Sequence, residues 1–233
     1  MLLILVIITI IGIMIYFINE SQKFNPTAEL IQLQDPNKTI IQENIKSKSP
    51  LLIHNLLNND ISDFSFEKIV IDNPGYIIKD NQKNISLSIF NDKNIKQVYI
   101  LDNPHLIDDF KLKESFKTME DTFSDDLTFN LRTKMNLFKG DHKVNIQKNK
   151  HNNLIISQLY GETIFYIINP KHSEIINKNY NEIKKWSIKI ILKQGLNLYI
   201  PPEWFYIYEV QKDSIFANTY SDNYFTFLYN YLR

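Results

Sequence analysis

The first hydrophobic pattern in the chain is an apolar run at its N-terminus. Residues 2–18 carry no charged side chain, and as a helix they would span about 25 Å, close to the thickness of a bilayer core. No basic residue precedes the run and no small-x-small site follows it, which favours an uncleaved anchor over a signal peptide. The run predicts a single-pass transmembrane anchor over residues 1–20 and a membrane localisation. The charges of Glu20 and Lys23 cancel, so the sequence predicts neither the orientation of the anchor nor the membrane that holds it.

Beyond this run the pattern turns polar and then becomes strand-like. Residues 21–48 contain Pro26 and Pro36 and predict a tether that leads into one domain over residues 49–233. In that domain, short β-branched and aromatic runs between Gly and Pro turns predict strands at 144–150, 154–159, 162–168, 187–191, 197–200, 204–210 and 214–220. Helices are expected at 113–123 and, after a Ser221-Asp222 cap, at 224–232. The pattern predicts a mainly β domain with flanking helices, of the sandwich or barrel type.

Composition narrows the functional classes. The 233 residues carry 26 basic and 26 acidic side chains, and arginine occurs only at positions 132 and 233. Nucleic acid is therefore not expected as a partner. Cysteine is absent, which excludes a disulfide, a thiolate nucleophile and a cysteine-ligated metal. The sequence also contains no P-loop, no G-x-G-x-x-G and no G-x-S-x-G motif.

Four segments follow one another in the order found in a known family. They are residues 49–56, which begin Ser-Pro before an apolar triplet; residues 98–102; residues 137–170, with an Asn153-Leu154 pair and a Gly161 turn; and residues 187–218, around Gly195 and Pro201-Pro202. Together they resemble JmjC or cupin-like proteins of the factor-inhibiting-hydroxylase type. The resemblance implies a double-stranded β-helix, or jelly roll, which is the fold of Fe(II)/2-oxoglutarate oxygenases.

The resemblance also implies where a metal would bind. Active members hold Fe(II) with a His-x-Asp pair and a distal histidine. The matching positions are Gln147, Asn149 and Tyr206, and the lysine that binds 2-oxoglutarate matches Thr163. An amide replaces imidazole, Asn lacks the carboxylate charge, and a phenol is normally neutral at pH 7. The resemblance therefore implies no catalytic residue, no bound metal and no cofactor.

Polar positions in the later strands predict a pocket instead. Val144 and Ile146 alternate with Asn145, Gln147 and Asn149, so the amides share one face of a strand. Buried amides need hydrogen-bond partners, which a bound ligand could supply. In the alternative interpretation the amides satisfy one another in a filled barrel or face solvent. The predicted pocket residues are Asn145, Gln147, Asn149, Asn153, Gln158, Thr163 and Tyr206.

The remaining candidates carry less weight. None of the five histidines forms an H-x-D pair, and His142 and His151 are interpreted as solvated loop residues beside lysines. The acidic positions at 120–126 are interpreted as a solvated helix face.

These observations predict a membrane-anchored, non-catalytic binding or structural module. Its expected partners are a membrane, contacted through residues 2–18, and an unknown protein or small polar ligand. The alternative is an Fe(II)/2-oxoglutarate-type hydroxylase or other oxygenase, in which Tyr206 and a loop histidine form an atypical metal site.

Overall fold

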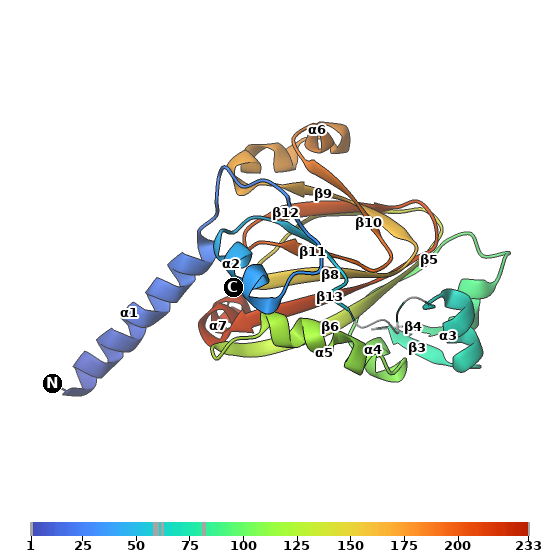
Figure 1. Cartoon of the computed structure of the whole chain (residues 1–233), viewed down its shortest axis with the longest axis horizontal. Coiled ribbons are helices and arrows are strands. Elements are labelled where there is room, and N and C mark those ends of the chain that lie inside the picture. The colour runs from blue at the N-terminus through green and yellow to red at the C-terminus, as the bar shows by residue number, and fades with distance from the viewer. Residues whose placement is uncertain (1, 58–60, 62, 81–82, 233) are drawn as a thin grey trace.

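The computed structural model describes residues 2–57, 61, 63–80 and 83–232 and shows a mixed α/β arrangement (Figure 1). The described strands are β1 (Ile31–Leu33), β2 (Leu51–His54), β3 (Ile77–Asp80), β4 (Lys83–Ser86), β5 (Val98–Asn103), β6 (Thr128–Lys139), β7 (His142–Lys148), β8 (Asn153–Tyr160), β9 (Glu162–Ile168), β10 (Ile188–Lys193), β11 (Leu196–Ile200), β12 (Phe205–Val210) and β13 (Ser214–Asn223). The described helices are α1 (Leu2–Gln22), α2 (Lys38–Lys46), α3 (Phe66–Asp72), α4 (Leu106–Asp109), α5 (Lys113–Phe123), α6 (Tyr180–Lys185) and α7 (Tyr224–Leu232), with 3-10 helices η2 (Leu87–Asn91) and η3 (Pro170–Asn177).

Two sheets face each other across the central core. One has the strand order β1-β2-β11-β8-β13-β6-β5 and the other the order β10-β9-β12-β7, while β3 and β4 form a separate hairpin. Strands place successive side chains on opposite faces. In β8, Leu154 and Ile156 therefore enter the core between the sheets, whereas Ile155 and Leu159 pack on the other side.

Helices cover the outer faces of both sheets. The face of the seven-stranded sheet that carries Ile155 and Leu159 packs against Phe116 and Met119 of α5 and against residues of α3 and α4. The outer face of the four-stranded sheet packs against η3 and α6, through residues that include Ile183. The seven-stranded sheet is therefore buried on both faces, which explains why its central strands β8 and β13 are almost continuously buried.

Local patterns located the later elements well. All seven predicted strands are present as β7 to β13, and the largest difference is at the end of β13, which extends to residue 223 rather than 220. The two predicted helices are α5 and α7. The predicted Ser221-Asp222 cap is wrong, because both residues belong to β13 and the Asn223 side chain accepts a hydrogen bond from the Thr226 amide at 2.8 Å.

The prediction of a mainly β jelly-roll domain with a transmembrane helix is wrong. The chain is mixed α/β, with thirteen described strands in three sheets and a substantial helical layer. Much of the difference lies between residues 55 and 123, where the pattern indicated only one strand and one helix. That segment also contains α3, α4, η2 and the β3–β4 hairpin, all elements of seven residues or fewer and too short to show a clear period.

The helix α1 also differs from the prediction. Within the described part of the chain, no helix combines the length and the apolar character needed to cross a membrane. The predicted anchor over residues 1–20, and with it the single-pass membrane localisation, is therefore wrong. The end of α1 is attached to the domain, because Phe17 stacks on Phe225 of α7 with ring centroids 4.7 Å apart. Its exposed apolar side chains run from Ile4 to Tyr16, about 20 Å along a helix.

The end of α1 is held by a charged cap as well. The Lys48 ammonium donates to the backbone carbonyls of Glu20 and Lys23, the latter at 2.9 Å. A cation at this end complements the helix dipole. The Gln22 amide also donates to the Tyr229 hydroxyl at 3.0 Å, so α1 and α7 support each other.

Two glycine turns give a matched test of this packing. Both Gly161 and Gly195 have positive φ, +70° and +84°, but a Cβ at Gly161 would lie 2.3 Å from the Asp213 carbonyl oxygen, whereas one at Gly195 meets no atom within 4 Å. Gly195→Ala should lower the free energy of unfolding by about 1–2 kcal/mol because of the backbone conformation alone. Gly161→Ala should cost about 1–3 kcal/mol more because the Asp213 backbone must move. Urea unfolding of both variants measures this difference, and equal losses would contradict the register of this turn.

Candidate functional site

One pocket lies at an open end of the space between the two sheets and holds three of the predicted site residues. Its volume is about 390 Å³. We call it the polar pocket, because most of its lining is charged or amide-bearing; the lining residues are Asp102, Arg132, Lys134, Gln147, Lys148, Asn149, Lys150, His151, Leu154, Tyr206 and Tyr220. Gln147, Asn149 and Tyr206, the positions matched to the metal ligands, all line this pocket.

Strand register explains why these residues meet. Tyr206 of β12 lies directly opposite Gln147 of β7, and directly opposite residues in an antiparallel pair share a face. The register shifts between Tyr206 and Tyr208, which marks a bulge beside the pocket. Just beyond β7, the Asn149 amide donates to the Trp204 carbonyl at 2.8 Å and fixes the chain at the pocket wall.

The side chain of Asn149 is already fully engaged. It is 1% exposed. Its Nδ2 donates to the Ile200 carbonyl at 2.8 Å, and its Oδ1 accepts from the His151 amide at 2.9 Å. Asn149 is therefore a structural residue that shapes the turn after β7, and it offers neither a metal nor a ligand a free oxygen.

Tyr206 presents a neutral phenol to the pocket. The side chain is 4% exposed, and burial, together with the negative charge of Asp102, raises the pKa of Tyr206 far above its usual value. A phenol that stays protonated is a poor metal ligand. Because Gln147 is a neutral amide and Asn149 is engaged, the three side chains do not fit Fe(II). Among the described residues, no group of three or more His, Cys, Asp or Glu side chains could hold a metal ion.

The other predicted pocket residues lie elsewhere. Gln158 and Thr163 are near the opposite end of the core, where Gln158 Nε2 donates to Ser214 Oγ at 2.7 Å and the Thr163 and Ser214 hydroxyls are 2.8 Å apart. Asn153 bonds to the Ser221 hydroxyl at 2.9 Å, and Asn145 is exposed on β7. None of these four lines the polar pocket, and apolar side chains of the core separate Gln158 and Thr163 from it.

Positive charge is concentrated around the polar pocket. Four basic side chains line it, against the single carboxylate of Asp102: Arg132 and Lys134 from β6, Lys148 at the end of β7, and Lys150 just beyond that strand. Lys148 forms an ion pair with Glu203. Since the whole chain has a formal net charge of zero, the pocket is a local positive region within a neutral protein.

Asp102 is held in an unusual backbone conformation at this pocket. Its φ is +48°, a region that residues other than glycine rarely adopt. One carboxylate oxygen accepts hydrogen bonds from the Tyr220 hydroxyl and from Asn218 Nδ2, each at 3.1 Å, and the Asp102 amide donates to Asn136 Oδ1 at 2.9 Å. Strained conformations of this kind persist where surrounding contacts impose them, often at functional sites.

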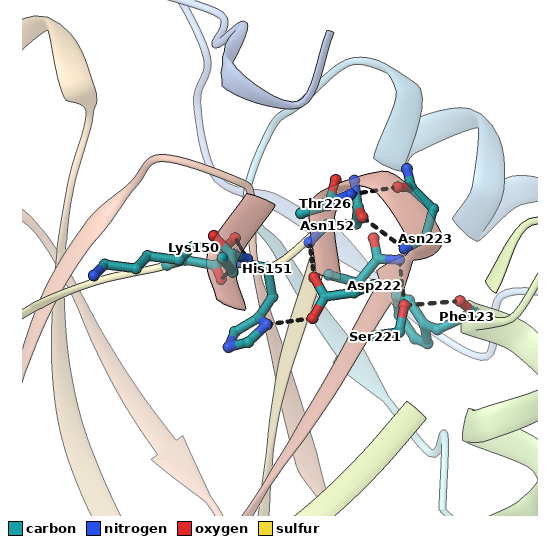
Figure 2. A network of polar contacts seen from close by, with 11 residues as sticks. Phe123, Lys150, His151, Asn152, Ser221, Asp222, Asn223 and Thr226 are labelled. Atoms are coloured by element: carbon teal, nitrogen blue, oxygen red, sulfur yellow. Dashed lines mark hydrogen bonds and ion pairs between the residues drawn. The ribbon is translucent and has the colours of Figure 1, made fainter. Parts of the chain in front are cut away.

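A histidine and aspartate pair forms part of the pocket wall, and the sequence did not reveal it. His151 Nδ1 lies 2.6 Å from Asp222 Oδ2, and the other Asp222 oxygen accepts from the Asn152 amide at 3.1 Å (Figure 2). The Asp222 side chain is 1% exposed and that of His151 19%. The interpretation of His151 as a solvated loop residue is wrong. The partners are 71 residues apart, so no local pattern could have paired them.

Two substitutions of asparagine test the structural role of Asn149. Asn149→Asp replaces the Nδ2 donor with a carboxylate oxygen that faces the Ile200 carbonyl, and should lower the free energy of unfolding by about 1–3 kcal/mol. Asn145→Asp makes the same chemical change at an exposed position of the preceding strand and should change stability by less than about 0.5 kcal/mol. Chemical denaturation at pH 7 compares them. If Asn149→Asp leaves the free energy of unfolding unchanged, the side-chain amide of Asn149 does not make the hydrogen bond described here.

Comparison with known proteins gives no relative: no family model matches the chain, and no curated protein matches it.

Proposed function

We propose that the protein is a non-catalytic binding domain that uses the polar pocket to hold a small polar ligand. One observation carries this proposal: the positions that resemble an oxygenase iron site lie together, yet they hold an exposed amide, an engaged amide and a neutral phenol. The pocket has the concave shape and converging polar groups of a ligand site. It lacks a donor set suited to redox iron.

The alternative, an oxygenase with an atypical metal site, has weaker support. The nearest imidazole is that of His151, whose Nδ1 is engaged by Asp222. Both Asp222 oxygens already accept hydrogen bonds within the wall of the pocket. This contact leaves the His151 Nε2 atom unengaged by Asp222, but no group of three His, Cys, Asp or Glu side chains among the described residues could complete a metal site with it.

Metal analysis of the purified full-length protein tests the proposal. After expression in medium supplemented with iron, manganese and zinc, elemental analysis should find none of them at a stoichiometric level. Fe(II) or Mn(II) with 2-oxoglutarate should leave the melting temperature unchanged. One tightly held metal ion per chain, or oxygen consumption dependent on 2-oxoglutarate, would overturn the proposal.

Restoring the matching ligands tests the residue assignment separately. The triple variant Gln147→His, Asn149→Asp, Tyr206→His should gain Mn(II) binding, because the three side chains converge on one pocket. The variants Gln147→His and Gln147→His with Asn145→Asp should not, since each lacks the full donor set. Circular dichroism first verifies folding, and Mn(II) titration by electron paramagnetic resonance then measures binding. A folded triple variant without affinity would contradict the assignment.

A further inference from the structure

We propose that the ligand of the polar pocket is a sugar phosphate, a hydroxylated ring carrying a phosphate monoester. This inference rests on the proposed function, since it names the ligand class of the same pocket. It follows from two neighbouring groups of side chains in the lining, one suited to a dianion and the other to hydroxyl groups.

The basic side chains Arg132, Lys134 and Lys150 form the first group. Arg132 and Lys134 lie two residues apart on β6, so both side chains project from the same face of the strand. Arg132 Cζ and Lys134 Nζ each lie 5.8 Å from the centre of the Tyr220 ring, which brings two positive charges to one aromatic ring. Lys150 lines the same pocket from the segment after β7.

These three cations, of which Lys134 is half-buried and Arg132 and Lys150 are exposed, have no carboxylate partner. Elsewhere the domain pairs half-buried lysines with carboxylates, as in Lys148 with Glu203 and Lys184 with Glu209. Over the described ranges, neither Arg132 nor Lys134 nor Lys150 forms an ion pair with a carboxylate. Like charges gathered in a concave site repel one another, and a bound dianion removes that cost. Phosphate suits both the charge and the forked geometry of arginine.

Asp102 and Gln147 form the second group. Asp102 Oδ1 is occupied by Tyr220 and Asn218, whereas no described residue donates to Oδ2. The Gln147 side chain likewise makes no hydrogen bond to a described residue and borders the same pocket. A carboxylate beside a phosphate site repels inorganic phosphate but accepts a hydrogen bond from a hydroxyl group. An amide can serve as donor and acceptor to further hydroxyls.

Aromatic rings complete the lining and are held in place. Tyr206 and Tyr220 form a firm, largely buried wall of the pocket, with only 4% and 8% of their surface exposed. The His151 ring lies 4.6 Å from that of Tyr220, and the Asp222 contact shown in Figure 2 holds the imidazole there. A volume of about 390 Å³ lies within the usual range for small-ligand sites.

Calorimetric titration of the full-length protein tests the inference. The protein is stripped with chelator and titrated with glucose 6-phosphate, glucose and inorganic phosphate at low ionic strength. Glucose 6-phosphate should bind at least about tenfold more tightly than either fragment, because only it engages both groups of side chains. Equal affinity for inorganic phosphate, or no binding of glucose 6-phosphate, would overturn the inference.

Charge-removing variants locate the phosphate group. Arg132→Gln and Lys134→Gln should each weaken glucose 6-phosphate binding by about tenfold or more, the effect of one charge-assisted hydrogen bond. Lys189→Gln, which removes an exposed lysine of β10 outside the pocket, should leave affinity unchanged. Equal effects at all three positions would indicate a general charge effect and contradict the assignment.

The variant Asp102→Asn distinguishes the role of the hydroxyl-binding group from that of the basic group. Asn tolerates positive φ, so the variant should fold. It should weaken glucose 6-phosphate binding, because an amide is a poorer hydroxyl acceptor, and strengthen inorganic phosphate binding, because the repulsion is gone. Parallel changes for both ligands would contradict the role given to Asp102.

The same samples distinguish failure of the inference from failure of the proposed function. If the metal-free protein binds none of the three ligands and also binds no metal, only the assignment of a sugar phosphate as the ligand is wrong. If Fe(II) binds stoichiometrically, the proposed function itself is wrong.

Discussion

The packing of aromatic rings between the two sheets determines the rest of this structure. Phe138 stacks on Phe216 with ring centroids 5.5 Å apart, and Tyr208 meets Phe165 and Phe216 at 5.3 and 5.2 Å. These rings come from both sheets and fill the space that could otherwise form a deep cavity. They fix the separation of the sheets and fill the space between them, so that the polar pocket lies at an open end and not deep in the core.

That filled core also separates two groups of polar residues with different roles. At one end, Gln158, Thr163 and Ser214 bond to one another and are fully buried. At the other end, Gln147, Asp102 and the basic residues remain able to contact solvent or a ligand. Each group contains a glutamine, buried and bonded at Gln158 but exposed at Gln147, so position along the strands decides which of the two amides can meet a ligand.

Sequence patterns located individual elements better than they located contacts. The strands β7 to β13 and the helices α5 and α7 followed from periodicity and turn residues, and the register of β7 with β12 then placed Gln147 beside Tyr206. The fold class did not follow, because short helices between residues 55 and 123 carry little periodic signal.

The anchor was predicted from hydropathy alone, which gave no sign of the contact between Phe17 and Phe225. Arg132 and Lys134 were missed because the first part of β6 was not recognised as a strand. The pairing of His151 with Asp222 depends on folding, which brings distant segments together.

The engagement of Asn149 has a consequence for the paths open to this sequence. Its amide supports the turn after β7 from both sides, through Ile200 and His151, so a carboxylate at this position has no benefit until imidazoles are also present at 147 and 206. Each single step toward a metal site therefore gives a protein that is less stable or no better at binding iron.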